Sequence, residues 1–341
     1  MESMADTQFS VTTSPHLRTT VTVSSAMRDV LYALAPITLV SIYWFKFNAV
    51  FLIAVCLIVA MLTELLFRKA MNKPATLKDG SALVTGLLVA LCSGGCSAWW
   101  VGALATFIAV GIAKELMGGL GWNRFNPAAF GRISVFLLTP FFYWLGLAFS
   151  PLQASFGGLD VITSATPLAL LKQGTALPDL GSLFLSFPGG ALGETSALAL
   201  LIGGAYLLYK EHIRWHIPVS IVAGVFVMAL LFGDHSTTPF YLTPFYHIFS
   251  GGVLLGALFM ATDWVTSPIT PRGRVIFGLA IGILLMIFRL ALGPTEGTCF
   301  SILIMNAFVP LIDRLTRQRK FGEAPARPAP VAVKPSLEKS S

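Results

Sequence analysis

The chain alternates between long apolar segments and short polar ones. Several apolar segments reach the ~20 residues that a helix needs to cross a bilayer. The pattern therefore predicts an all-α integral membrane protein with ten membrane-spanning helices. The predicted spans are 30–47, 48–68, 82–97, 98–116, 127–149, 194–210, 213–232, 245–262, 274–292 and 296–313.

The polar segments divide the chain into three parts. Residues 1–29 are polar and lack the apolar stretch of a cleavable signal. Residues 30–320 form one ten-helix membrane domain, in which 150–193 is the longest loop. Residues 321–341 are rich in Pro, Ala and Lys, a composition typical of a disordered tail.

Composition supports a membrane protein. Of the 341 residues, 55% are hydrophobic and 11% are charged, whereas a soluble domain has about 25% charged residues. The net charge of +7 is spread over short loops, which does not indicate binding to nucleic acid. The four cysteines lie in or beside apolar segments and do not resemble a secreted disulfide framework.

The distribution of Lys and Arg predicts the orientation. With a cytoplasmic N-terminus, all but three of the 23 basic residues lie on the cytoplasmic side, as the positive-inside rule requires. The exceptions are Lys46, Lys172 and Arg289. Both termini are then cytoplasmic, and the loop 150–193 is extracytoplasmic.

Ten spans divide into five plus five, and an odd number per half makes repeated halves inverted. The segments 123–132 (NRFNPAAFGR) and 267–274 (SPITPRGR) are alike, since each is a polar, Pro-containing inner loop before a span. The span 82–97 is interrupted by Gly94 and Gly95. Broken helices at membrane depth usually line a site, although a tight turn between two short spans is the alternative.

Few residues offer chemistry. Glu64, Lys114 and Glu115 lie near inner helix ends, where we expect their side chains to reach water. Cys92 and Cys96 have no evident ligand partners and are interpreted as small packing residues. No catalytic residue, metal motif or nucleotide-binding motif stands out, so a redox role would require a cofactor.

The segment DVITSATPLALL (160–171) resembles the flavinylation motif of membrane subunits of the RnfD/NqrB family. The matching positions are Asp160, Val161, Ile162, Thr163, Ser164, Ala165 and Thr166, with Ser164 where Gly is usual. The resemblance implies that the phosphate of FMN is esterified to Thr166 by an extracytoplasmic flavin transferase. An ordinary Ser/Thr-rich loop is the structural alternative.

The resemblance extends over nearly the whole chain. It includes SPHLR near the start and the segments 79–92, 118–132, 251–274 and 294–314, which look like RnfD. It implies a subunit of the Rnf complex of the bacterial inner membrane, with RnfA, RnfB, RnfC, RnfE and RnfG as partners. That complex transfers electrons between ferredoxin and NAD and translocates Na⁺ or H⁺. The fold implied is ten helices in two inverted halves, similar to urea transporters.

Two asparagines suggest a second cofactor, a non-covalently bound riboflavin. In NqrB relatives, two Asn in a GWNxxNP-like loop are associated with non-covalent riboflavin, and Asn123 and Asn126 occupy these places. Amides both donate and accept, which suits the edge of a flavin ring. The alternative is an Asn cap and an Asn-Pro turn at the start of the span 127–149.

Two other functions stay open at this point. The first is an NqrB-type subunit of the Na⁺-translocating NADH:quinone reductase, although NqrB chains have a longer N-terminal extension than residues 1–29. The second is a urea-transporter-like solute channel without redox function.

Overall fold

The computed structural model describes residues 22–74, 76–95, 97–144, 167–173, 177–233, 239–292 and 297–317. Within these residues the secondary structure is helical, and the pairing of Gly94 with Ala191 is an isolated bridge. The all-α prediction is confirmed for the described part. The α-helices are α1 (Val23–Ala70), α2 (Ser81–Cys92), α3 (Trp99–Phe107), α4 (Pro127–Trp144), α5 (Pro167–Gln173), α6 (Leu180–Leu185), α7 (Ala197–Tyr209), α8 (His216–Phe232), α9 (Thr243–Phe249), α10 (Val253–Leu255), α11 (Pro271–Ile287) and α12 (Gly297–Leu315).

Five other helical segments connect or extend these helices. The 3₁₀ turns η1 (Leu77–Asp79) and η3 (Leu192–Glu194) precede α2 and α7. The π-helical segments η2 (Ile108–Leu116), η4 (Gly256–Met260) and η5 (Phe288–Leu292) continue α3, α10 and α11. Segments of this type often occur at functional sites.

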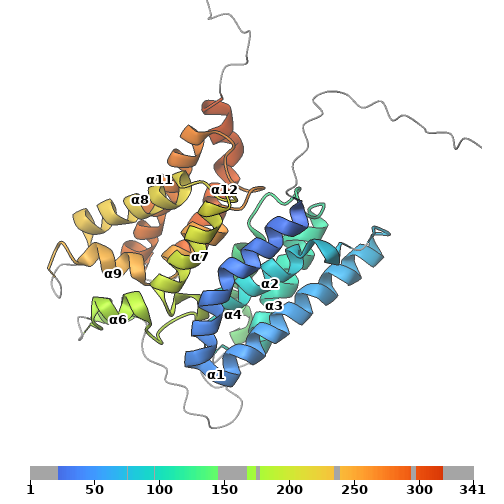
Figure 1. Ribbon diagram of the computed structural model, residues 1–341, viewed down its shortest axis with the longest axis horizontal. Coiled ribbons are helices and arrows are strands. Elements are labelled where there is room, and N and C mark those ends of the chain that lie inside the picture. The colour runs from blue at the N-terminus through green and yellow to red at the C-terminus, as the bar shows by residue number, and fades with distance from the viewer. Residues whose placement is uncertain are drawn as a thin grey trace, which may run out of the picture.

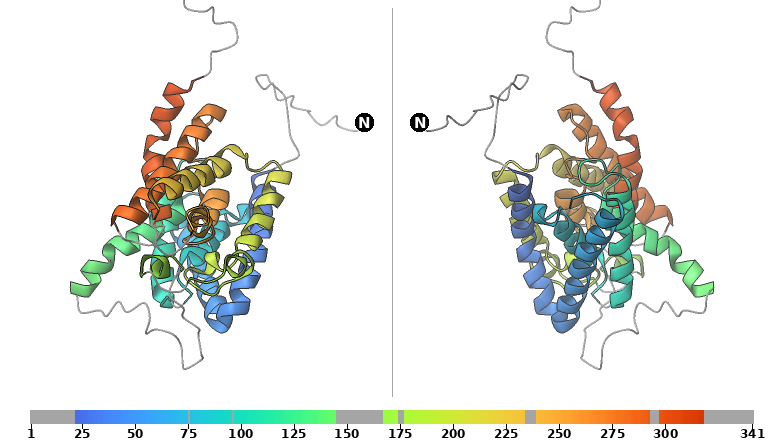
Figure 2. Two further views of the ribbon diagram at one scale, coloured as in Figure 1. Left: turned by 90° about the vertical axis from the view of Figure 1, so that its left-hand side faces the viewer. Right: turned by 90° about the vertical axis from the view of Figure 1, so that its right-hand side faces the viewer.

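Helix α1 is two antiparallel arms rather than one rod. Lys46 has φ 49° and ψ −127°, which interrupts the helix, and the chain reverses direction there (Figure 1). The separate spans predicted at 30–47 and 48–68 correspond to these arms. Figure 2 shows α1 on one side of the molecule and α11 and α12 on the other.

Several helices in the described residues are long and apolar enough to cross a membrane. They are Val23–Ala70, Trp99–Leu116, Pro271–Ala291 and Gly297–Leu315, and the bent pair formed by α9 with α10 and η4 adds a fifth. Shorter apolar helices are α2, residues Pro127–Leu138 of α4, α7 and α8. The structure therefore supports an integral membrane protein.

Two predicted spans are broken at the same tripeptide. Ser93-Gly94-Gly95 follows α2, as the two glycines predicted. Ser250-Gly251-Gly252 separates α9 from α10 with a bend of 62°, a break inside the predicted span 245–262 that was not identified from the sequence. Gly251 and Gly252 have φ values of 68° and 69°, a left-handed conformation that ends a helix and that glycine adopts readily.

The polar groups freed by these breaks have partners inside the protein. Leu192 N donates to Ser93 O at 3.0 Å, and Gly95 N donates to Gly190 O at 3.4 Å. Arg289 from η5 donates to the carbonyls of His247, Ser250 and Gly251 at 2.7, 2.9 and 2.8 Å. Arg289 is fully buried, so its charge lies within the protein rather than on an outer aqueous surface.

The predicted loop 150–193 is partly helical. Helices α5 and α6 and the turn η3 lie within it, while residues 150–166 lie outside the described part. Asp179 caps α6 by accepting from Gly181 N at 2.9 Å, and Phe184 contacts Phe249 of α9 with ring centroids 5.6 Å apart. Helix α6 lies at the end of the molecule opposite the start of α1 (Figure 1).

Candidate functional site

A cavity lies between α1, α2, the start of α4, α7 and η4. It contains about 830 Å³ of space, including its open mouth. It is close to the start of α1 and the end of α7, on the side predicted to be cytoplasmic. Its polar lining residues are Ser81, Thr85, Lys114, Asn123, Asn126, His212, Thr262 and Asp263, and its apolar ones include Leu88, Leu120, Ile213, Leu258 and Phe259.

A glycine-rich turn brings Asn123 to this cavity. Gly118, Gly119 and Gly121 have φ values of 121°, 95° and 94°, which other residues rarely adopt. Gly119 N donates to Lys114 O at 2.9 Å. A β-carbon at Gly119 would lie 2.6 Å from Nη2 of Arg68, so both the conformation and the space favour glycine.

Asn123 has an unused hydrogen-bond acceptor. The side chain is 5% exposed, and its Nδ2 donates to Phe125 O at 3.3 Å. The side chain also hydrogen-bonds the carboxylate of Asp263. Its Oδ1 is buried and has no partner among the described residues. Such an atom is costly unless a ligand or water donates to it.

Asn126 is occupied by structural contacts. Its Oδ1 accepts from Ala129 N at 3.1 Å and caps α4, and its Nδ2 donates to Met260 O at 2.9 Å. Its backbone N donates to Asn306 Oδ1 at 3.1 Å, and Asn306 Nδ2 donates to Thr266 O at 2.9 Å. The capping alternative is therefore present in the structure. Asn306 also joins the loop before α4 to the loop before α11.

Asp263 follows η4 at the cavity wall. Its carboxylate accepts from Val265 N at 3.4 Å and from Thr266 Oγ1 at 3.1 Å. The Asp263 side chain is partly buried in the protein, and Asp263 also lines the cavity. Burial raises the pKa of the Asp263 carboxyl above its usual value, while hydrogen bonds from Val265, Thr266 and Asn123 act in the opposite direction.

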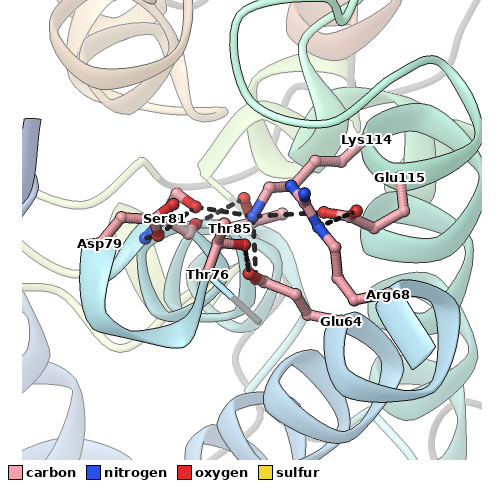
Figure 3. Close-up of polar contacts among 8 residues, drawn as sticks. All are labelled: Glu64, Arg68, Thr76, Asp79, Ser81, Thr85, Lys114 and Glu115. Carbon is pink, nitrogen blue, oxygen red and sulfur yellow. Dashed lines mark hydrogen bonds and ion pairs between the residues drawn. The ribbon is translucent and has the colours of Figure 1, made fainter. Parts of the chain in front are cut away.

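An ionic network lies beside the cavity (Figure 3). Lys114 Nζ is 2.9 Å from Glu64 Oε2 and 3.9 Å from Glu115 Oε1, and Arg68 Nε is 2.7 Å from Glu115 Oε2. Glu64, Lys114 and Glu115 are 0%, 2% and 1% exposed. The expectation that these three side chains reach water was wrong. Two cations and two carboxylates instead compensate one another inside the protein.

Lys114 connects the network to the cavity. Its Nζ donates to Ser81 Oγ at 2.6 Å, and Ser81 Oγ donates to Asp79 Oδ1 at 2.7 Å. Thr76 Oγ1 donates to Glu64 Oε1. Both Ser81 and Lys114 line the cavity, so a positively charged group is held at its wall by fixed partners.

A second charged cluster lies at the cavity edge. His212 Nε2 and Asp29 Oδ2 are 2.7 Å apart, and Tyr206 OH donates to Asp29 Oδ1 at 2.9 Å. Trp264 Nε1 donates to His212 O at 2.5 Å. Sequence reasoning missed this cluster, because Asp29 and His212 are 183 positions apart and no local spacing marks them as partners.

The predicted flavinylation motif lies outside the described residues. This applies to Asp160, Thr163, Ser164, Ala165 and Thr166, and also to Cys96. Cys92 is buried, with Sγ 3.6 Å from Met260 Sδ, as the packing interpretation predicts. Among the described residues, no group of three His, Cys, Asp or Glu side chains could hold a metal ion.

The sequence matches known proteins over nearly its full length. The model of the NQR2, RnfD, RnfE family matches residues 10–322. The D subunit of the proton-translocating ferredoxin:NAD(+) oxidoreductase complex of Clostridium ljungdahlii is 42% identical over 324 residues, covering 92% of this chain and 96% of the relative. The D subunit of the Na(+)-translocating ferredoxin:NAD(+) oxidoreductase complex of Acetobacterium woodii is 41% identical over 327 residues, covering 94% and 97%.

Proposed function

Because the chain belongs to the NQR2, RnfD, RnfE family, we propose that it is the RnfD component of an Rnf complex. In this role it carries electrons between ferredoxin and NAD as one membrane subunit of an ion-translocating oxidoreductase. The observation that carries the proposal is the match to the D subunits of two ferredoxin:NAD(+) oxidoreductase complexes over more than nine-tenths of both chains. One of these relatives is named as proton-translocating and the other as Na⁺-translocating. The proposal is therefore translocation of H⁺ or Na⁺, without a choice between the two ions.

The proposed membrane topology is ten spans in two inverted halves of the urea-transporter type. Two features support it. The third predicted span of each half is broken at Ser-Gly-Gly. The fourth span of each half ends in a π-helix with a buried cation, Lys114 in η2 and Arg289 in η5. Both termini are proposed to face the cytoplasm of a bacterial inner membrane, with residues 30–320 as the membrane domain.

FMN is proposed to be bound covalently to Thr166. The residues Asp160, Thr163, Ser164 and Ala165 form the flank that a flavin transferase recognises outside the cytoplasm. Pro167, the next residue, begins α5, which packs against α9. A bound flavin supplies one- and two-electron transfer that protein side chains cannot. The proposed partners are RnfA, RnfB, RnfC, RnfE and RnfG, one of which exchanges electrons with this flavin.

Riboflavin is proposed to bind in the cavity, and the chemistry of the lining fits it. The unpartnered Asn123 Oδ1 can accept from an imide N–H, and Lys114 can donate to a neighbouring carbonyl. Leu88, Leu120 and Phe259 supply apolar walls for a ring. A quinone has carbonyl acceptors but no N–H for Asn123. Asn126 positions the wall through its bonds to Ala129 and Met260.

Riboflavin content separates the roles of the two asparagines. We expect Asn123→Ala to lose most of the acid-extractable riboflavin from the purified complex and to lower its melting temperature only slightly, because the change removes the unpaired acceptor and the side-chain bonds to Phe125 O and Asp263 but no helix cap. Asn126→Ala should lower both, because it removes a helix cap worth about 1 kcal/mol. Unchanged riboflavin in Asn123→Ala, at wild-type protein content, would contradict the assignment of the cavity.

The Rnf role is tested in membrane vesicles. Cells lacking this chain should lose ferredoxin-dependent NAD reduction and the cation uptake driven by it, and the full chain should restore both. Restored solute flux without any ferredoxin-dependent electron transfer would favour a channel instead.

A further inference from the structure

A second pocket adjoins the cavity on the side predicted to be cytoplasmic. It contains about 680 Å³ of space, including its open mouth. The turn between α7 and α8, the segment after η4 and the start of α11 form it, and His212 and Trp264 line both spaces. The flavin proposals do not use this pocket.

Two arginines from different parts of the chain line this pocket. Arg274 donates from Nε to Pro268 O at 3.0 Å, which anchors its guanidinium. Arg214, from the α7–α8 turn, is exposed, and both Arg214 and Asp313 interact electrostatically with Arg274. Glu211 is the carboxylate in the lining, and His212 is paired with Asp29. Two guanidinium groups therefore share the lining with one carboxylate.

The pocket also has an apolar edge. Trp264 is 54% exposed and Ile269 is 77% exposed, and both line the pocket. The bond from Trp264 Nε1 to His212 O fixes the indole at 2.5 Å. Aromatic and apolar side chains beside arginines are typical of the cytoplasmic membrane interface. A ligand that fits has an anionic head for the arginines and an apolar part for the edge.

We propose that this pocket binds the phosphate group of an acidic phospholipid from the cytoplasmic leaflet. Guanidinium groups bind phosphate through paired, charge-assisted hydrogen bonds. Basic pockets between transmembrane helices on the cytoplasmic side are known to bind acidic lipid head groups. The same groups could bind free phosphate, so the test includes both sources.

The test uses photo-crosslinking in native membranes that contain the assembled complex. A photoactivatable phosphatidylglycerol should label peptides of this chain around Trp264 and Ile269, and a photoactivatable phosphatidylcholine should not. Arg214→Gln should reduce labelling about fivefold, the ratio expected for one basic residue at a membrane surface, and Arg214→Lys should retain most of it. Arg272→Gln is the matched control, because Arg272 is exposed beside Arg274 but does not line the pocket.

The outcomes separate the alternatives. Labelling that depends on Arg214, and that unlabelled phosphatidylglycerol displaces but inorganic phosphate does not, supports the lipid site. Equal displacement by inorganic phosphate would reject the lipid and assign a free phosphate. Equal losses of labelling in Arg214→Gln and Arg272→Gln would overturn the proposal, since the diffuse positive charge of the surface explains such a result. Equal labelling by phosphatidylglycerol and phosphatidylcholine would also overturn it.

Discussion

The buried ion pair of Lys114 and Glu64 provides the sharpest test of the network beside the cavity. At the Nζ to Oε2 distance of 2.9 Å, two unit charges attract by about 6 kcal/mol at an effective dielectric constant of about 20. Lys114→Met removes this attraction and leaves Glu64 charged and fully buried. Removing one partner of a buried pair typically destabilises a protein by about 3–5 kcal/mol.

The loss of stability in Lys114→Met should arise mainly from the unpaired charge of Glu64. Glu115 keeps the guanidinium of Arg68 at 2.7 Å, whereas Glu64 keeps only the hydroxyl of Thr76 among the contacts that its carboxylate makes with the described residues. We therefore expect the double variant Lys114→Met with Glu64→Gln to regain much of the lost stability. The amide oxygen of the introduced glutamine can still accept from Thr76, and no uncompensated charge is left.

The assay is the apparent melting temperature of the purified complex in detergent, with Lys78→Met as control because Lys78 is exposed. Since membrane proteins often unfold irreversibly, all variants are heated at one scan rate. Lys114→Met should melt several degrees below wild type, Lys78→Met at the wild-type temperature, and the double variant between them. A single variant as stable as the control, or a double variant less stable than the single one, would refute this reasoning.

Three further predictions follow from other parts of the chain. Thr166→Ala should abolish covalent flavin in a denaturing gel, while Thr163→Ala should retain some fluorescence. Burial raises the pKa of Asp263 in the folded state, so the folded protein holds this proton at pH values where the unfolded chain has lost it. Stability should therefore rise as the pH falls through the folded-state pKa toward the ordinary value of 3.8; Asp263→Asn should remove this rise in melting curves recorded over a series of falling pH, and an unchanged pH profile would contradict it. Arg289→Met should destabilise the protein by about 2 kcal/mol or more in thermal melts, because the carbonyls of His247 and Ser250 lose this donor, while Gly251 O keeps Thr298 Oγ1 at 3.0 Å; a wild-type melting temperature would show that they find other partners.

Hydropathy was sufficient to find most helices but not their interruptions. The two arms of α1, the end of α2 near Gly94, and α11 with η5 agree with the predicted spans. The break at 250–252 was missed because the span 245–262 was placed from its average hydropathy, which His247, Ser250 and the two glycines do not lower enough to divide it. The recurrence of Ser-Gly-Gly at 93–95 and 250–252 was the available signal.

Polar contacts inside the membrane domain were the least predictable feature. The position of Lys114 near a helix end suggested access to water, but a helix end can face other helices instead of solvent. Its partner Glu64 is 50 positions away, and only the packing of α1 against η2 brings them together. Asn126 was equally ambiguous, since an Asn before Pro can cap a helix or contact a ligand, and the structure shows the cap.

The central claim is that this chain is a redox subunit with covalently bound flavin. Mass spectrometry of the peptide containing Thr166, taken from cells that have the flavin transferase, tests it most directly. We expect a mass increase equal to FMN less one water, located on Thr166. An unmodified peptide from such cells would contradict the claim and favour a membrane protein of this family without that flavin.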